Sequence, residues 1–301
     1  MGEVYMATAK MRGGAPAGIK RVLAVSLCVL YVLLCPICAQ AQDAPSGGAQ
    51  IAAREGAAVH LLFAQTDSYM AVRVGDSRPL SFFLMHRNAI PFEGRTIERA
   101  MFPEDETIWF ETTSLQPAQP CGRYHASSIL CQPLFRVPGR FEFDSIKLLF
   151  TDGSTDRYGI GRIVIEVFDE EGSDALDTYV TTALGSDKTE FYARYLKETD
   201  DVLLTGLHLD VAASVSAPVI RETFFTYASG EQQDAFEVTV TFVDPKPVVY
   251  RFLLPRVAVT VNGTRQWVYP KVGCYCGGLP IQEEEMLEAY WAWQDGSPAE
   301  R

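Results

Sequence analysis

Residues 257–261 read VAVTV and residues 264–269 read TRQWVY, with only Asn262 and Gly263 between them. In the first run every second residue is valine, a period of two that is typical of a strand with one buried face. Asn-Gly between two such runs predicts a tight hairpin, because both central residues of that turn need a positive φ. The same alternation appears upstream in residues 236–242, FEVTVTF. This part of the chain therefore predicts antiparallel β-structure.

Short runs of the same kind recur along most of the chain. Turn sequences rich in glycine, aspartate, serine and proline separate them, and no long helical period lies among them. The pattern predicts an all-β fold, an antiparallel β-sandwich of the jelly-roll or Ig-like kind, built as one large or two smaller units. The further candidate strands are 58–63, 69–74, 80–85, 107–112, 145–150, 158–168, 178–183, 190–196, 202–211, 220–227 and 248–253.

The C-terminal stretch departs from this pattern. Pro280 suits the first position of a helix, residues 283–285 are three glutamates where the helix dipole favours negative charge, and Gly296 suits the far end. Tyr290 and Trp293 recur on one face of such a helix. We expect a short C-terminal helix that packs on a sheet, with a docking peptide for a partner as the alternative.

The N-terminus indicates the cellular compartment. Lys20 and Arg21 precede an uncharged apolar run at 22–37, and residues 39–41 (Ala-Gln-Ala) match a small-x-small cleavage pattern. We interpret residues 1–41 as a signal peptide and expect an exported protein of the periplasm or cell envelope. Two alternatives stay open: an uncleaved anchor, the one case in which we expect membrane contact, and lipidation at a cysteine of this segment.

Charge and composition exclude two classes of protein. The chain has 26 Lys and Arg against 38 Asp and Glu; residues 1–41 hold four of the basic and one of the acidic residues, so the remainder carries a net charge of −15. An acidic surface without a basic stripe repels phosphate backbones, which excludes nucleic acid as a partner. A hydrophobic content of 48% is too high for a disordered chain.

The expected domain organisation follows from these signals. Proline and cysteine gather between two strand-rich regions, and we interpret that stretch as a connection. The expected segments are a signal peptide (1–41), a flexible linker (42–55), a first β region (56–115), the Pro- and Cys-containing connection (116–140), a second β region (141–273) and the Cys-x-Cys with the C-terminal helix and tail (274–301).

Four cysteines follow the signal segment: Cys121, Cys131, Cys274 and Cys276. An even number in an exported chain favours disulfides. A bridge across a single residue strains disulfide geometry, so we expect either a local Cys121–Cys131 bridge or bonds from both to the Cys-x-Cys pair. Zinc held by these thiolates and His125 is the alternative, but oxidising conditions and the one-residue spacing argue against it. We therefore expect no metal and no other cofactor.

The sequence offers no recognisable catalytic motif. It contains no His-Glu-x-x-His, no Gly-x-Ser-x-Gly and no phosphate-binding glycine loop, so we assign no catalytic residue and do not expect an enzyme. We expect a binding or structural module that contacts another protein or an assembly. A carbohydrate-binding or glycan-acting jelly roll and an outer-membrane β-barrel are the alternatives. The candidate partner or glycan contacts are Trp109, Trp267, Tyr290, Trp291 and Trp293.

Overall fold

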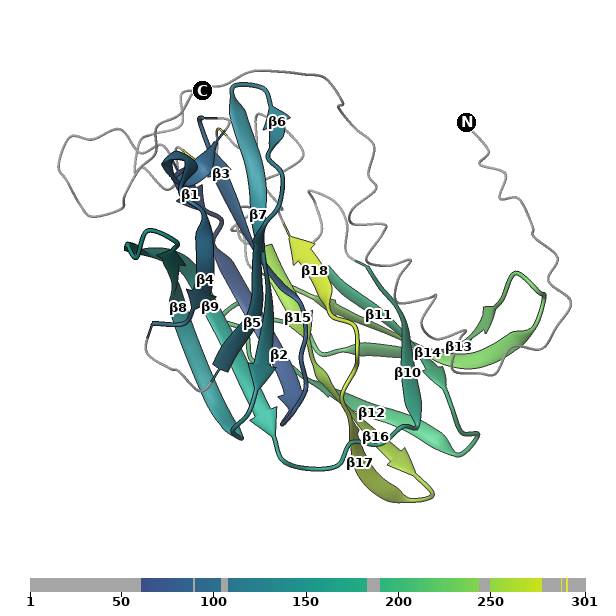
Figure 1. Cartoon of the computed structure of the whole chain (residues 1–301). Helices are drawn as coiled ribbons and strands as arrows, with labels where there is room; N and C mark the ends of the chain where they lie inside the picture. Colours follow the sequence, from purple (N-terminus) through teal and green to yellow (C-terminus); the bar gives the residue numbers. More distant parts are fainter. Residues whose placement is uncertain are drawn as a thin grey trace, which may run out of the picture. The chain divides into compact units, whose positions relative to one another are not determined.

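Strands and turns make up almost all of the described chain (Figure 1). The computed structural model describes residues 61–88, 90–103, 108–182, 190–243, 250–277, 288 and 291, with backbone alone at 109, 111, 112, 179–182, 276 and 277. These residues belong to one compact unit, Ala44–Arg301. The expected all-β fold is thereby confirmed, and each candidate strand coincides with an observed one.

The strands of the described residues form four sheets. The first has the order β1-β3-β7-β5, with β6 beside β7: β1 (Leu61–Phe63), β3 (Leu80–His86), β5 (Ile108–Leu115), β6 (Gln119–Cys121) and β7 (Tyr124–Phe135). The central sheet has the order β18-β15-β2-β9-β8-β4: β2 (Thr66–Arg73), β4 (Ile97–Met101), β8 (Gly139–Phe150), β9 (Thr155–Phe168), β15 (Tyr250–Leu254) and β18 (Cys274–Gly277). A 3-10 turn at Pro91–Gly94 precedes β4.

Two smaller sheets come from the later part of the chain. One has the order β10-β11-β14-β13: β10 (Leu176–Thr182), β11 (Glu190–Lys197), β13 (Val219–Thr226) and β14 (Gln232–Thr241). The other has the order β12-β16-β17: β12 (Val202–His208), β16 (Arg256–Val261) and β17 (Thr264–Val268). The expected Asn-Gly hairpin joins β16 to β17, and both Asn262 and Gly263 have positive φ, 49° and 77°.

The central sheet is mixed rather than antiparallel throughout. β2 lies between β15 and β9 and runs parallel to both, whereas every other pairing of named strands in the described chain is antiparallel. All residues of β2 except Arg73 are buried, as expected for a parallel strand covered on both faces. Sequence period alone carries no information on this direction, because parallel and antiparallel strands share it.

Two hydrophobic cores lie on opposite faces of the central sheet. Met70 and Val72 of β2 belong to the first core, which the central sheet shares with the β1-β3-β7-β5 sheet. Tyr69 and Ala71 belong to the second core, which it shares with the two smaller sheets. This layered packing of sheets is compatible with the expected β-sandwich.

The stretch expected to be a connection is largely strand. Residues 119–121 and 124–135 form β6 and β7, and β7 pairs with β3, β5 and β6. Pro133 is tolerated there because it lies opposite Phe110, beside a β-bulge where the ladder is irregular. The two expected β regions also share one sheet, since β2 pairs with β9 and β15.

Both ends of the chain fall mainly outside the described residues. These include the expected signal peptide, the linker and most of the expected C-terminal helix, of which only Glu288 and Trp291 are described. Among the described residues, no helix is both long and apolar enough to cross a membrane.

Candidate functional site

The tryptophans expected to contact a partner or glycan do not form a common surface in the described chain. Trp109 lies in β5 opposite Leu134, with only its backbone described. Trp267 in β17 already has two cationic neighbours, because the guanidinium carbons of Arg256 and Arg265 lie 4.1 and 5.2 Å from its ring centroid. Tyr290 and Trp293 lie outside the described residues.

Trp291 is a buried anchor rather than an exposed ring. It stacks on Tyr124 with ring centroids 5.5 Å apart, and the Arg87 guanidinium lies 4.9 Å from its centroid. Three residues earlier, Glu288 forms an ion pair with Arg123 at 2.5 Å. Both contacts attach this segment to the start of β7, which agrees with the expectation that it packs on a sheet.

The expected disulfides are not found among the described side chains. Cys121, Cys131 and Cys274 form no bond with one another, because they contact different hydrophobic clusters. Cys121 pairs with Tyr124 in the β6–β7 hairpin, and Cys131 lies seven residues further along β7, roughly 24 Å away at the rise of an antiparallel strand. The local bridge is therefore wrong, since disulfide-bonded Cα atoms lie within about 7 Å. Only the backbone of Cys276 is described.

The zinc alternative has no support in the described ranges. His125 stacks on His86, with ring centroids 5.6 Å apart. No group of three or more His, Cys, Asp or Glu side chains in these ranges is arranged to hold a metal ion. Burial also raises the pKa of the Cys131 and Cys274 thiols to about 12, which disfavours the thiolate form that metals require.

A buried serine–histidine pair was not expected from the sequence. The Ser127 hydroxyl donates to His86 Nε2 at 2.7 Å, while His86 Nδ1–H donates to the Asn88 carbonyl oxygen. This arrangement fixes the tautomer and resembles a base-activated hydroxyl. Both side chains are buried, however, at 1% exposure for His86 and 6% for Ser127, so we interpret the pair as a cross-strand bond between β3 and β7.

Acidification is expected to destabilise the protein through His86. Burial lowers its pKa from 6.5 to about 4, so the unfolded chain takes up a proton that the folded protein does not. The neutral, buried ring therefore contributes about 3 kcal/mol to the free energy of unfolding. This contribution is fully present above pH 6.5 and is lost as the pH falls to 4. Urea unfolding at pH 7 and pH 4.5 measures it, and His86→Gln should flatten this part of the profile. An NMR titration of the His86 ring with a midpoint near 6.5 contradicts the prediction.

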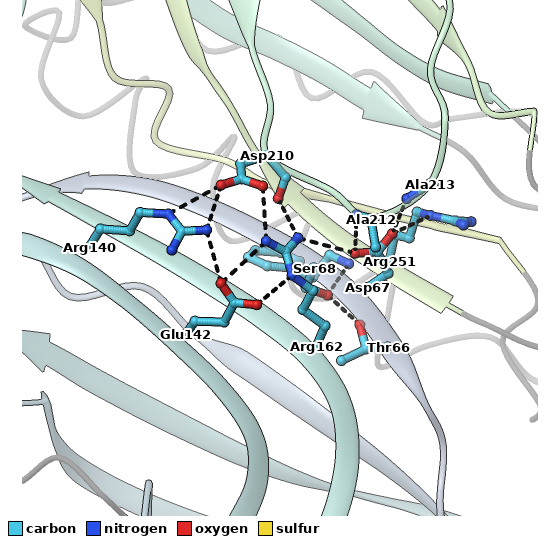
Figure 2. A network of polar contacts seen from close by, with 11 residues as sticks. Thr66, Asp67, Ser68, Arg140, Glu142, Arg162, Asp210, Ala212, Ala213 and Arg251 are labelled. Atoms are coloured by element: carbon cyan, nitrogen blue, oxygen red, sulfur yellow. Dashed lines mark hydrogen bonds and ion pairs between the residues drawn. The ribbon is translucent and has the colours of Figure 1, made fainter.

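An ion-pair network joins the central sheet to the segment after β12 (Figure 2). Arg162 of β9 donates from Nε to Glu142 Oε1 at 2.8 Å and from a terminal nitrogen to Asp210 Oδ1 at 3.0 Å. Arg140 of β8 donates to the same two carboxylates, at 2.9 Å to Glu142 and 2.8 Å to Asp210. Each carboxylate is thus shared by two guanidinium groups.

Asp67 of β2 is the buried end of this network. Its two carboxylate oxygens accept the backbone N–H groups of Ala212 and Ala213, at 2.8 and 3.0 Å. Arg162 and Arg251 approach the same carboxylate at 3.8 and 3.7 Å (Figure 2). Asp67 therefore fixes the backbone after β12 onto the central sheet, and the Ser68 hydroxyl beside it accepts the Phe252 N–H at 2.7 Å.

The charges of the network are balanced. Hydrogen bonds from Arg162 lower the pKa of Glu142. Burial alone would raise the pKa of Asp210, but hydrogen bonds from Arg140 and Arg162 outweigh it and the net shift is downward. With Asp67 and Arg251 the network holds three carboxylates and three guanidinium groups. We interpret it as a structural network that holds the segment after β12 in place, since each of its carboxylates accepts hydrogen bonds from guanidinium or backbone N–H groups.

A cleft of about 270 Å³ opens beside the network. Its polar lining includes Glu142 and Asp144, and the Asp144 side chain is 86% exposed. Carboxylates beside apolar groups suit hydroxyl-rich ligands, because the oxygens accept hydrogen bonds while the apolar groups cover C–H faces. The complete lining is Pro103, Glu142, Phe143, Asp144, Ser145 and Arg162.

Several exposed apolar side chains follow the last strand of the β10-β11-β14-β13 sheet. β13 pairs with β14 on one side, and no described strand pairs with its other side (Figure 1). Val219 and Phe224, towards its two ends, are 50% and 56% exposed. Val215 bridges to Phe242 at the end of β14, next to the 68% exposed Val243. We call Val215, Val219, Phe224 and Val243 the β13 edge.

The sequence itself carries a signal for this edge. A half-buried strand shows apolar residues on one face only, whereas residues 219–226, VIRETFFT, have adjacent apolar pairs at 219–220 and 224–225. Apolar side chains on both faces of an edge strand are typical of a surface that another molecule covers.

Comparison with known proteins gives no family for the chain. Its sequence matches no protein-family model, and no curated protein shows a significant match.

Proposed function

We propose that the protein is exported, loses residues 1–41 and serves in the periplasm or cell envelope as a non-enzymatic β-sandwich module that contacts another protein or an assembly. The observation that carries this proposal is the exposed apolar β13 edge. Soluble proteins usually protect an edge strand by charge, proline or short length. β13 has eight residues, no proline, and its two charges lie in the middle, at Arg221 and Glu222.

The proposed module consists of two sandwiches that share the central sheet. Support comes from the two cores on the opposite faces of β2. The C-terminal helix would close the first sandwich near the β6–β7 hairpin, with Trp291 as its anchor. Glu288 and Trp291 are three positions apart and contact adjacent residues, Arg123 and Tyr124, as side chains on one helical face do.

Binding of a glycan is the second candidate. The cleft beside the network favours it, because Glu142 and Asp144 offer carboxylate oxygens next to Phe143 and Pro103. The tryptophans do not favour it, since Trp267 contacts two arginines and Trp291 is buried.

Two measurements test the proposal. The intact mass of the protein from its native envelope should begin at Gln42. A photo-activated cross-linker placed at Phe224 should join the protein to a defined protein partner. The same cross-linker at Val137, another exposed apolar residue at 45%, should give no such product.

The contrary results are equally specific. A mass that retains residues 1–41, or equal cross-linking from both positions, contradicts the proposed function. If neither position cross-links and neutral oligosaccharides shift the NMR signal of Ser145, a glycan replaces the protein partner.

A further inference from the structure

We infer that the β13 edge binds a second copy of this chain, through a twofold antiparallel pairing of β13 with itself that is centred on Glu222. This inference rests on the proposed function, because it names the partner for the same surface. A twofold interface requires one patch to complement itself. Three features of β13 meet that requirement: its sequence, its faces and its local charge.

The sequence of β13 is symmetric in character about Glu222. Residues 219–225 read VIRETFF, with two apolar residues at each end and one polar residue on each side of the centre. Antiparallel pairing about Glu222 places Val219 opposite Phe225 of the second copy, and Ile220 opposite Phe224. Every apolar residue of the stretch then meets an apolar residue, and Arg221 meets Thr223.

The faces of the strand also agree. Opposed residues in an antiparallel pair lie on the same face of the sheet, and the proposed pairs satisfy this rule because their numbers differ by two, four or six. Ile220 packs against the second hydrophobic core, whereas Phe224, on the same face, is 56% exposed. In the pair, Phe224 of one copy covers Ile220 of the other. The second core thus continues across the interface.

The charges around this edge are close to balance, unlike those of the whole chain. The full chain carries a net charge of −12, so two copies repel each other over most of their surface. β13 itself carries one cation, Arg221, and one anion, Glu222. Behind it lie Asp234 and Glu237 of β14 and Arg194 and Lys197 of β11. Lys197 Nζ lies 3.3 Å from Glu222 Oε1 and partly neutralises it. The two opposed Glu222 side chains remain the unfavourable contact of the pairing. Removal of this charge should therefore strengthen the dimer.

Backbone hydrogen bonds complete the pairing. The side of β13 that no described strand covers presents its N–H and C=O groups to a partner strand. Pairing two copies joins two four-stranded sheets into one eight-stranded sheet. An interface of one strand pair with flanking side chains is small, so we expect a dimer whose population depends on concentration.

Site-specific cysteines test the register. The protein purified after export is compared with Glu222→Cys and Thr223→Cys under mild oxidation. Glu222→Cys should yield a disulfide-linked dimer, because directly opposed Cα atoms lie about 5 Å apart. Thr223→Cys should not, because the two copies of residue 223 are offset along the strands beyond the reach of a disulfide. Equal cross-linking of both variants, or none in either, overturns the inference.

Sedimentation velocity over a range of concentrations tests the energetics. Glu222→Gln should lower the dimer Kd up to about fivefold, because it removes a directly opposed like-charge pair. Phe224→Ser should raise the Kd at least tenfold, and the control Val137→Ser should leave it unchanged. A protein that is monomeric at every concentration overturns the self-pairing. A dimer Kd that neither of the two β13 substitutions changes overturns it as well.

Failure of the self-pairing and failure of the proposed function remain distinguishable. If Glu222→Cys stays monomeric while the cross-linker at Phe224 captures a different protein in the envelope, the binding function stands and the second copy is the wrong partner. If the protein dimerises as expected but its mass retains residues 1–41, the pairing stands and the proposed export does not.

Discussion

Gly161→Ala is expected to lower the free energy of unfolding by about 4 kcal/mol, because it combines backbone strain with overpacking of two central strands. Gly161 has φ +85°, a conformation that favours glycine. A Cβ atom there would lie 2.3 Å from the carbonyl oxygen of Thr66 and 2.6 Å from its nitrogen. Both are backbone atoms of β2, a strand of the central sheet in which every residue except Arg73 is buried, so they have little room to move.

Gly159 provides the matched control on the same strand. A Cβ atom at that position meets nothing within 4 Å, and its φ needs no glycine. Gly159→Ala should therefore change stability by less than about 0.5 kcal/mol. Urea unfolding of both variants, followed by far-UV circular dichroism, measures the difference. Similar stabilities for the two variants would show that β2 and β9 do not approach as closely as described.

Asp67→Asn is expected to cost about 3 kcal/mol, the lower end of the range for breaking a buried ion pair. The substitution preserves volume but removes the charge that faces Arg162 and Arg251. It also leaves one oxygen to accept two backbone N–H groups, those of Ala212 and Ala213. A buried guanidinium without its counter-charge and a buried N–H without an acceptor each disfavour the folded state.

Asp144→Asn separates this effect from a general effect of lost charge. Asp144 belongs to the neighbouring cleft, but its side chain is 86% exposed. Its replacement should change stability by less than about 0.5 kcal/mol. The free energies of unfolding of the two variants at neutral pH give the test. A loss below 1 kcal/mol for Asp67→Asn would mean that the network does not hold the segment after β12 on the central sheet.

The alternation of apolar residues predicted most of the strands but not β4, β6, β7 and β18, and β7 is the longest of those missed. Its core-facing positions include His125 and Ser127, which interrupt the apolar period at its start, and Pro133 interrupts it again near its end. Ser127 is tolerated inside because it forms a hydrogen bond with His86. A partner that lies 41 residues away leaves no trace in a local pattern.

The network and the cysteines show the same limit. The members of the network look like ordinary charged residues in the sequence, and only the order of the strands brings them together. They include Asp67, Glu142, Arg162, Asp210 and Arg251. Export and an even cysteine count favoured disulfides, yet the fold places the described thiols in separate clusters. By contrast, the symmetry of β13 is local and is visible in the sequence itself.

The position of β2 between β9 and β15 also affects when the protein can fold during its synthesis. Tyr69 has its strand neighbours at Val164 and Leu253, 95 and 184 residues further along the chain. Such distant pairings give a high contact order, which slows folding because long loops must close before their contacts repay the lost entropy. The central sheet therefore cannot assemble until the last quarter of the chain is present. That delay suits the proposed export, since a polypeptide that threads a secretion channel must arrive there unfolded.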